Sequence, residues 1–379
     1  MNIRKTKIIA TLGPVSTSKS IIDKMIIAGM DTVRINMSHY NSNFDLRSIV
    51  STIRKSAKSH NKSVSIMMDL PGPKIRTNNK DIIQIKRGGE YTLGKEADIP
   101  INFNLKFKGL ENGAKVKIDD GKILFKVIKK ISHSKILLRS KNGGEINLRK
   151  GVNISGLDIN LPTLQSADIK FAKMAIDLEL DWIALSFVRS KDDRELLDKL
   201  FKRKKHHIPL IAKIEKREAV NNINDIIDSF DGVLIARGDL GLELELEKVP
   251  SLQKEIIKKC NKRCKPVIVA TQMLESMIEN PLPTRAEVSD VASAIYDGTD
   301  AVMLSGETAV GDFPLESIRM MKTISLNIEK EISINEGFGN LIPIPEKVDV
   351  KESICFSAYQ MSEDLSIKVM VVMTESGDT

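Results

Sequence analysis

Short apolar runs alternate with amphipathic stretches of helical spacing over most of this sequence. The runs Lys7–Leu12, Thr32–Asn36 and Val64–Leu70 are predicted strands, with helices predicted at Ser18–Ala28 and Asn43–His60. The alternation resumes near residue 163 with five further predicted strands, each followed by a helical stretch: Trp182–Val188, Leu210–Glu215, Gly232–Arg237, Pro266–Thr271 and Ala301–Ser305. Eight β/α units predict a closed (β/α)8 TIM barrel, an α/β fold. An open doubly wound sheet is the alternative, but no G-x-G-x-x-G motif follows the first strand.

The pattern changes after Pro71-Gly72-Pro73. Gly-Gly and Asp-Asp-Gly turns then separate short strand-like pieces: Ile82–Lys86, Lys115–Ile118, Ile123–Ile128 and Lys135–Leu138. Such pieces are typical of all-β structure. We therefore expect a small β-barrel domain at residues 71–157, inserted into a larger barrel made of residues 1–70 and 158–335.

The last part of the sequence, residues 336–379, holds a predicted linker at Gly337–Pro345, a helix at Ser353–Asp364 and a strand at Lys368–Met373. One helix and one strand are too small to form a core of their own. We therefore expect this part to pack on the barrel, to pair with another chain, or to begin a larger α/β domain.

The composition argues against several classes of protein. No run of eighteen apolar residues is present, so we expect no membrane partner. The net charge is +8, but the lysines are spread along the chain and aromatic residues make up only 4%, so we expect no nucleic-acid partner. Three cysteines fit a reducing compartment and predict a cytoplasmic protein.

Polar side chains gather where the predicted barrel strands end, and these ends converge on one mouth in a parallel barrel. The two carboxylates Glu215 and Asp239 suit a hard divalent cation such as Mg²⁺. Arg34 and Lys213 supply positive charge for an anionic substrate. Any one of these side chains alone could serve only in a salt bridge, whereas their recurrence on several strand ends favours a functional site. The full set is Arg34, Asn36, Ser38, Asp69, Lys213, Glu215, Arg237, Gly238, Asp239, Thr271, Ser305 and Glu307.

Seven motifs in these positions make the sequence similar to a known family. They are Ala10–Pro14 (ATLGP), Val33–His39 (VRINMSH), Asp69–Thr77 (DLPGPKIRT), Leu210–Glu218 (LIAKIEKRE), Ala236–Gly241 (ARGDLG), Ala270–Met277 (ATQMLESM) and Met303–Thr308 (MLSGET). In this order, and through residues 4–331, the sequence resembles the pyruvate kinases. The resemblance implies phosphoryl transfer from phosphoenolpyruvate to ADP, giving pyruvate and ATP. It also implies a barrel with a β lid inserted after the third strand.

The resemblance implies roles at the site of phosphoryl transfer. Glu215 and Asp239 would hold Mg²⁺, which Mn²⁺ could replace, between the phosphate and the enolate of phosphoenolpyruvate. Lys213 would lie against the transferring phosphoryl group and the enolate oxygen, and Arg34 would bind the phosphate.

For the second half of the reaction, protonation of enolpyruvate, the resemblance implies a further group of residues. Gly238 and Asp239 would grip the substrate carboxylate. Thr271 would place a hydroxyl beside the methylene carbon, with Ser305 and Glu307 behind it as a proton relay.

The nucleotide would be bound between barrel and lid. Arg76, His39 and Asn36 match residues of the family near the ADP phosphates, and Lys150 matches a lid lysine that closes onto the nucleotide. The turn Asp119-Asp120-Gly121 matches a lid turn that approaches the site, although a plain hairpin turn would have the same sequence.

Lys74 departs from the family pattern. Members that require K⁺ have a glutamate here, near an ion site that would correspond to Asn36, Ser38, Asp69 and the carbonyl of Leu70. A lysine ammonium can supply the single positive charge of K⁺, so we expect this protein to work without K⁺. The alternative is that Lys74 faces solvent and that K⁺ still binds.

The family's third domain is represented only by its opening helix and strand, and Thr374–Thr379 resembles the first turn of that domain's effector loop. We expect no response to sugar bisphosphates, exposed apolar surface around Ile354–Met373, and a homo-oligomer that is a dimer formed through the barrel. Two other functions stay open at this point. One is another Mg²⁺-dependent barrel enzyme acting on an enolate, and the other is a catalytically silent remnant that binds ligands without turnover.

Overall fold

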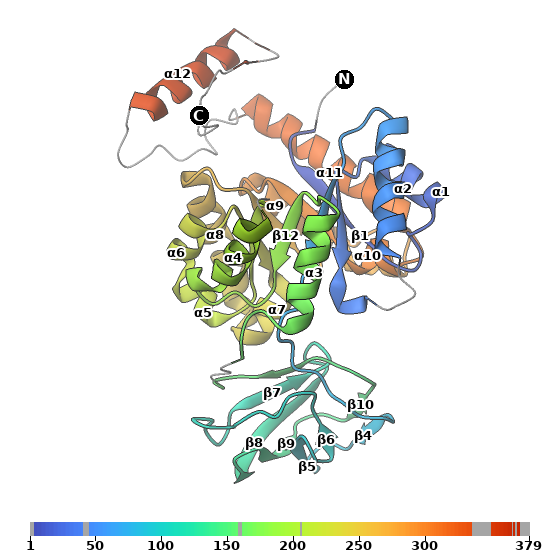
Figure 1. Cartoon of the computed structure of the whole chain (residues 1–379), viewed down its shortest axis with the longest axis vertical. Coiled ribbons are helices and arrows are strands. Elements are labelled where there is room, and N and C mark those ends of the chain that lie inside the picture. Colours follow the sequence, from blue (N-terminus) through green and yellow to red (C-terminus); the bar gives the residue numbers. More distant parts are fainter. Residues whose placement is uncertain are drawn as a thin grey trace.

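The structure is a computed structural model that describes residues 4–40, 45–157, 161–204, 207–335, 350–365, 367 and 370–371. Eight parallel strands close into a barrel in the order β1-β16-β15-β14-β13-β12-β3-β2 (Figure 1). This confirms the predicted barrel and rules out the open doubly wound sheet. The strands are β1 (Lys7–Leu12), β2 (Thr32–Asn36), β3 (Ser65–Asp69), β12 (Trp182–Leu185), β13 (Leu210–Ile214), β14 (Gly232–Ala236), β15 (Val267–Ala270) and β16 (Ala301–Leu304).

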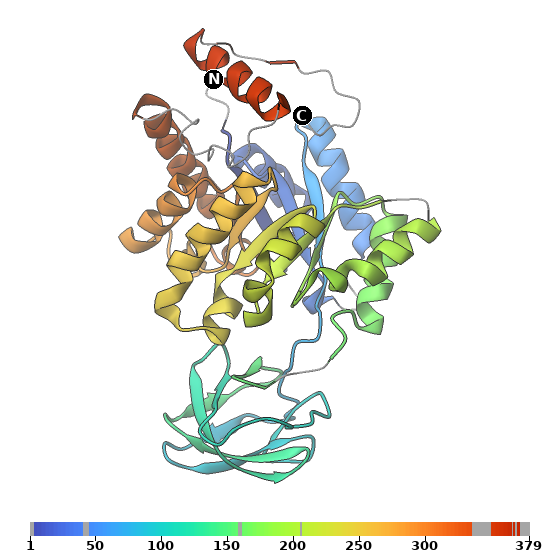
Figure 2. The ribbon, with the colours of Figure 1, turned by 90° about the vertical axis from the view of Figure 1, so that its left-hand side faces the viewer.

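Helices surround this barrel (Figure 2). The first begins at Ser18, whose side chain accepts a hydrogen bond from Ile21 N, and it ends at Gly29, where φ is 128°. The predicted start at Asn43 falls outside the described residues, and Asp45 caps the second helix. The helices are α1 (Lys19–Ala28), α2 (Leu46–Ser59), α3 (Ser166–Asp177), α4 (Glu195–Lys204), α5 (Arg217–Asn221), α6 (Ile223–Ser229), α7 (Arg237–Glu243), α8 (Val249–Lys262), α9 (Arg285–Tyr296), α10 (Gly306–Ala309) and α11 (Pro314–Asn335).

Alternation along each strand divides the barrel core into two layers. In β14, Leu234 and Ala236 pack inside the barrel, whereas Val233 and Ile235 pack against the surrounding helices. Successive side chains of a strand point to opposite faces, which explains why barrel strands read as continuous apolar runs. The apolar runs therefore predict the strands, and the few charged residues within them, such as Arg34 in β2 and Lys213 in β13, are candidates for a function.

Four aspartates close the amino-terminal end of the barrel. Asp31 accepts a hydrogen bond from Ile8 N at 2.7 Å, and Asp181 accepts one from Ile66 N at 2.7 Å. Two further aspartates repeat this contact on Leu210 N and Val267 N, both at 2.8 Å: Asp231 and Asp300. Each carboxylate satisfies a backbone donor at the start of a neighbouring strand. These residues serve the fold at the end opposite to the site.

Four predicted barrel strands extended one residue too far at their carboxyl ends, with a common reason. The true strands β13, β14, β15 and β16 end immediately before Glu215, Arg237, Thr271 and Ser305. Each of these residues is the first one after its strand, so its side chain no longer follows the alternation of inward and outward positions along the strand. It lies at the mouth of the barrel.

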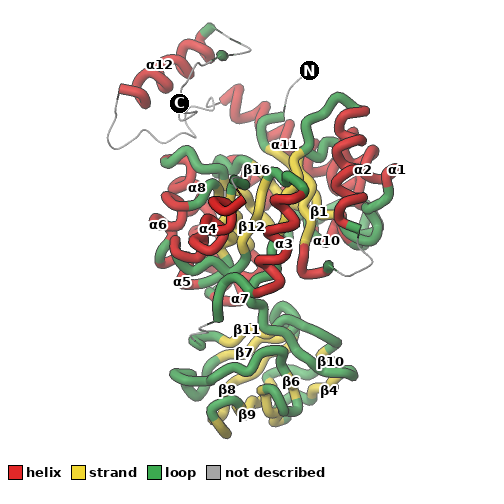
Figure 3. The backbone as a smooth tube through the Cα atoms, in the orientation of Figure 1, coloured by secondary structure: helices red, strands yellow, loops and turns green. Residues whose placement is uncertain are grey.

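The segment between β3 and α3 forms a lid beyond the carboxyl ends of the barrel strands (Figure 3). Its hinge contains Gly72 at φ 62°, where a Cβ atom would lie 2.9 Å from the ring of Phe187. The lid strands are β4 (Ile83–Ile85), β5 (Glu90–Gly94), β6 (Ile99–Pro100), β7 (Lys115–Ile118), β8 (Ile123–Ser132), β9 (Lys135–Ser140), β10 (Gly144–Ile146) and β11 (Val152–Ile154).

The lid differs from the predicted small β barrel. Its strands form a six-stranded sheet, in the order β11-β7-β8-β9-β5-β6, and a two-stranded sheet of β10 and β4. One apolar core, which includes Phe107, Phe125 and Leu138, lies between them. The sequence analysis missed β5, β6, β10 and β11, which are two to five residues long. We keep the predicted domain boundaries as a proposal.

A last helix, α12 (Val350–Asp364), lies beyond the end of the barrel opposite to the lid in Figures 1 and 2. It covers the predicted helix Ser353–Asp364, and Ile354, Phe356 and Met361 are exposed on it. The predicted linker at 337–345 and the loop at 374–379 lie outside the described residues, as does most of the predicted strand at 368–373. In the described part of the chain, no helix is long and apolar enough to cross a membrane.

Candidate active site

A cavity of about 310 Å³ lies between the carboxyl ends of the barrel strands and the lid. It brings together most of the residues that the sequence predicted for the site, including Asp119 and Asp120 of the lid turn. The lining residues are Arg34, Asn36, Ser38, His39, Pro71, Lys74, Arg76, Asp119, Asp120, Lys150, Gly151, Ser186, Phe187, Lys213, Glu215 and Asp239. The cavity is rich in both cations and carboxylates, which suits an anionic substrate with a cation.

Asp69, the last residue of β3, bonds to both Arg34 and Lys213 at the bottom of the cavity. Its Oδ2 accepts hydrogen bonds from Arg34 Nε at 2.8 Å, and its Oδ1 lies 3.1 Å from Lys213 Nζ. Ser186 Oγ lies 2.7 Å from the same ammonium. Burial alone would raise the pKa of Asp69, but Lys213 and Arg34 lower it below its ordinary value. Asp69 therefore stays charged and fixes the direction of both cations.

Lys213 is almost fully buried yet keeps its charge. Burial would lower its pKa, but Asp69 and Glu215 raise it above the ordinary value of 10.5. Glu215 Oε1 lies 3.0 Å from Lys213 Nζ, and Glu215 Oε2 accepts a hydrogen bond from Phe187 N at 2.7 Å. Phe187 has a left-handed φ of 57°, which turns its amide toward this carboxylate.

The second carboxylate, Asp239, belongs to the first turn of α7. Its Oδ1 accepts a hydrogen bond from Lys74 Nζ of the lid hinge at 2.8 Å. Burial would raise the pKa of Asp239, but Lys74, together with Lys213 and Lys216, lowers it below its ordinary value of 3.8. The charge of Lys74 thus pairs with Asp239, whereas the groups predicted for a K⁺ site have other partners: Asn36 Oδ1 accepts from Ser38 N, and Asp69 holds Arg34 and Lys213.

Glu215 and Asp239 fit a divalent metal ion by their chemistry. Both are carboxylates on one cavity, and the nearby charge of Asp239, added to burial, raises the pKa of Glu215. Within the described residues no group of three or more His, Cys, Asp or Glu side chains could hold a metal ion. Two carboxylates suffice for Mg²⁺, because this ion commonly takes its remaining ligands from water and substrate phosphate.

The other end of the cavity, formed by the lid and β2, is strongly cationic. Lys150 Nζ pairs with Asp119 Oδ1 at 2.9 Å, and Arg76 NH1 donates to the carbonyl of Arg149 at 3.2 Å. Burial lowers the pKa of His39, and the positive charges of Arg76 and Arg34 lower it further. A field that opposes protonation of a histidine attracts anions, such as the phosphates of a nucleotide.

Comparison with known proteins agrees with this geometry. The family model for the pyruvate kinase barrel domain matches residues 3–318. The chain belongs to the pyruvate kinase family. Pyruvate kinases of Staphylococcus aureus strains MRSA252 and USA300 are each 41% identical over 387 residues, which cover 100% of this chain and 66% of the relative. The chain thus spans about two thirds of the length of these curated relatives.

A solved structure gives the same result for the fold. The crystal structure of a pyruvate kinase from Cryptosporidium parvum superimposes with a TM-score of 0.89 at 34% identity, covering 99% of this chain and 79% of that one. Pyruvate kinases as a family use Mg²⁺ and K⁺ and act on phosphoenolpyruvate and ADP. The predicted family and fold are therefore confirmed.

Some residues predicted from the pyruvate kinase resemblance lie beside the cavity without lining it. Thr271 Oγ1 accepts a hydrogen bond from Gly238 N at 2.7 Å and donates to the carbonyl of Ala270 at 2.6 Å. Glu307 gives one oxygen to Leu274 N and the other to Ser305 N. Both oxygens of Glu307 thus bond to the backbone, and the relay through Ser305 and Glu307 stays a prediction.

Other residues near the cavity were missed by the sequence analysis. Ser186 and Phe187 follow β12 and contact Lys213 and Glu215, yet the predicted strand had included them. Thr11 accepts a hydrogen bond from Arg34 NH1 at 3.0 Å within a motif that had been noted without a role. Ser186 directly follows the apolar run Trp182–Leu185, and this position was the signal that could have found it.

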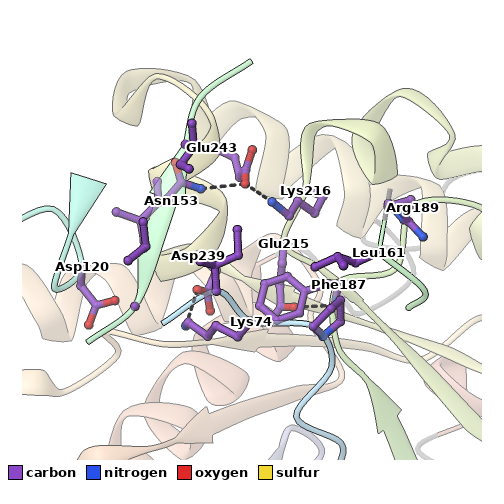
Figure 4. A pocket seen from close by; sticks show the side chains of 16 residues that line it. Lys74, Asp120, Asn153, Leu161, Phe187, Arg189, Glu215, Lys216, Asp239 and Glu243 are labelled. Atoms are coloured by element: carbon purple, nitrogen blue, oxygen red, sulfur yellow. Dashed lines mark hydrogen bonds and ion pairs between the residues drawn. The ribbon is translucent and has the colours of Figure 1, made fainter. Parts of the chain in front are cut away.

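A second, smaller cavity of about 60 Å³ adjoins the first and shares Lys74, Glu215 and Asp239 with it (Figure 4). There Glu243, the last residue of α7, accepts a hydrogen bond from Asn153 Nδ2 of the lid at 2.7 Å and pairs with Lys216. Nearby, Lys117 Nζ of the lid donates to the carbonyl of Leu242 at 2.8 Å. These contacts join the lid to the carboxyl end of α7.

Proposed function

We propose that this chain transfers the phosphoryl group of phosphoenolpyruvate to ADP and then protonates the enolpyruvate. In the first step the bond between phosphorus and the enol oxygen breaks, and a bond to a terminal oxygen of ADP forms. In the second step the methylene carbon takes a proton from solvent through the protein, giving pyruvate. The observation that carries the proposal is the arrangement of two buried cations, Arg34 and Lys213, on Asp69 beside the carboxylates Glu215 and Asp239.

The cations are suited to stabilise the phosphoryl group as its charge develops. Asp69 holds Arg34 and Lys213 from below, so neither side chain has to reorganise when the substrate arrives. Groups fixed in advance and shielded from water stabilise a transition state more than mobile ones do. Phosphoryl transfer depends mainly on such positioning.

Glu215 and Asp239 would hold Mg²⁺, or Mn²⁺ in its place, toward the cavity. When bound, the ion would neutralise negative charge on the phosphoryl and enolate oxygens. The backbone N–H groups at the start of α7, at Gly238 and Asp239, would bind the substrate carboxylate, and Thr271 would lie beside them.

We propose that Lys74 makes K⁺ unnecessary. Its ammonium lines the same cavity as Asn36 and Ser38 and is already paired with a carboxylate. A fixed charge at this place would supply what an alkali ion contributes to the electrostatic balance of the site.

The nucleotide would lie against the lid end of the cavity. Arg76, His39, Asn36 and Lys150 line it, and their charge suits the phosphates of ADP. This cationic end has no use in an enzyme that only forms or cleaves an enolate, so the kinase is favoured over that alternative. We also propose, from the sequence alone, a homodimer formed through the barrel and a cytoplasmic location.

The test is a coupled assay for pyruvate from phosphoenolpyruvate, ADP and Mg²⁺, first with Na⁺ only and then with added K⁺. We expect turnover that K⁺ leaves unchanged. Turnover only with K⁺ would keep the kinase and refute the role of Lys74. Folded protein without turnover in either salt would refute the kinase, and binding of Mg²⁺-ADP without turnover would identify a silent remnant.

A further inference from the structure

Two consecutive residues at the end of β15 adopt a conformation that their side chains disfavour. Thr271 has φ 71° and Gln272 has φ 53°. Left-handed backbone is rare for residues other than glycine, and a β-branched threonine there is a clear outlier. Such strain persists only where surrounding contacts hold it in place.

Arg237, the first residue of α7, supplies these contacts. Its NH2 group donates to the carbonyl of Thr271 at 2.8 Å and to that of Gln272 at 3.0 Å, and its Nε lies 3.3 Å from the carbonyl of Thr271. The guanidinium thus binds both strained residues by their backbone oxygens. In a planar fork, one group can hold two acceptors at fixed directions.

The guanidinium is itself held from the other side. Asp290 of α9 accepts from Arg237 NH1, with its two oxygens at 2.6 and 2.7 Å. Gln253 of α8 lies within 3.5 Å of the same nitrogen. Two helices therefore orient the Arg237 side chain, which is 11% exposed.

Arg237 also reaches Thr271 by a second route. Gly238 follows it in the chain, and Gly238 N donates to Thr271 Oγ1 at 2.7 Å. The side chain of Arg237 fixes the backbone of Thr271, while the next residue fixes its hydroxyl.

We propose that Arg237 is a positioning residue for the protonation half of the reaction. It holds Thr271 in its left-handed conformation so that the hydroxyl stays beside the methylene carbon of enolpyruvate. This role rests on the function proposed above. Arg34, Asp69 and Lys213 stand on β2, β3 and β13, and of the groups proposed for phosphoryl transfer only Asp239 shares α7 with Arg237. Loss of the Arg237 contacts should therefore impair protonation more than phosphoryl transfer.

The two halves can be measured separately on the full chain. ATP formation from phosphoenolpyruvate and ADP reports phosphoryl transfer, since released enolpyruvate becomes pyruvate without the enzyme. Exchange of the methyl protons of pyruvate with deuterated water, in the presence of Mg²⁺ and ATP, reports proton transfer. The informative quantity is the ratio of the exchange rate to the rate of ATP formation.

In Arg237→Lys we expect this ratio to fall by about tenfold to a hundredfold, because a lysine cannot hold two carbonyls and Asp290 together. Thr271→Val should lower the ratio in the same direction, since it removes the hydroxyl itself. Arg263→Lys is the matched control: this arginine of the α8 end pairs with the exposed Asp228, and its ratio should equal that of the wild type.

Equal losses in both rates would mean a merely structural role for Arg237 and would overturn the proposal. Should Arg237→Lys fail to fold, Asp290→Asn tests the same contact, since it removes the charge that orients the guanidinium, and an unchanged ratio there also overturns it. A wild-type chain that forms no ATP and exchanges no protons would overturn the proposed function first. Wild-type activity with a constant ratio in the variants would overturn this inference alone.

Discussion

Asp69 offers the sharpest test of how the site is built into the fold. It is 1% exposed, and it accepts three charge-assisted bonds: from Arg34 Nε at 2.8 Å, Arg34 NH2 at 2.7 Å and Lys213 Nζ at 3.1 Å. At about 1.5 kcal/mol each, these bonds amount to about 4–5 kcal/mol. Removing one partner of a buried pair costs about 3–5 kcal/mol, because the other charge stays buried. We predict that Asp69→Ala lowers the free energy of unfolding by about 3–5 kcal/mol.

Asparagine at this position should be little better than alanine. An amide oxygen can accept from one of the two cations, but the NH2 group must then face the other. The control is Glu90→Gln in the lid, which removes a carboxylate from Arg139 at 2.7 Å, with the two side chains 45% and 52% exposed. Exposed pairs contribute about 1 kcal/mol or less.

Denaturant unfolding would measure these differences. Trp182, the single tryptophan, lies on β12 opposite Met67 of β3, so its fluorescence reports the barrel next to Asp69. Pyruvate formation should also be lost in both Asp69 variants, because Arg34 and Lys213 lose their common support. An Asp69→Ala chain as stable as Glu90→Gln would refute the view that this carboxylate neutralises two buried cations.

Three further predictions concern the lid and the core beneath the site. Lys150→Met should raise the KM for ADP by about tenfold with little change in the KM for phosphoenolpyruvate; equal changes in both steady-state constants would contradict its place at the nucleotide end. Burial raises the pKa of Glu307 above its ordinary 4.5, so the folded chain keeps a proton that the unfolded chain releases. The free energy of unfolding should therefore fall as the pH rises from 4.5 toward the raised pKa of the folded chain. The pH profile of Glu307→Gln should lack this fall, and parallel profiles would assign the proton elsewhere. Lys117→Met removes the bond to Leu242 O, so amide exchange in β7 and β11 should speed up by about threefold to tenfold without a change in β13, and unchanged exchange would show that this bond does not hold the lid.

The sequence predicted the barrel well because its physical signal is strong. Each strand of the closed barrel is buried on both faces, so it appears as an apolar run between amphipathic helices. The first polar residues after these runs, such as Glu215 and Thr271, were therefore visible as candidates for the site. The lid was harder to predict, because β6 has two residues and β10 and β11 have three. Patterns this short carry almost no periodicity, so neither the strands nor the two-sheet arrangement could be predicted.

Partners of the site residues could not be predicted either. Lys74 and Asp239 are 165 positions apart in sequence, and their contact depends on how the hinge places the lid over the barrel. Likewise the left-handed turn at Thr271 leaves no mark in its sequence, since threonine and glutamine carry no preference for it. Residue types were thus predictable where the strand pattern fixed their place, and their contacts were not.

The two proposed metal ligands differ in what holds them. Glu215 directly follows a barrel strand and accepts a hydrogen bond from Phe187 N, so its place is set by the barrel alone. Asp239 stands in the seven-residue helix α7, whose amino end bonds to Thr271 and whose carboxyl end bonds to Lys117 and Asn153 of the lid. A lysine at the carboxyl end of a helix also stabilises its dipole. A movement of the lid must therefore pull on α7 and on Asp239, while Glu215 keeps its position. The distance between the two carboxylates, and with it the affinity for a divalent ion, should then depend on whether the lid is closed.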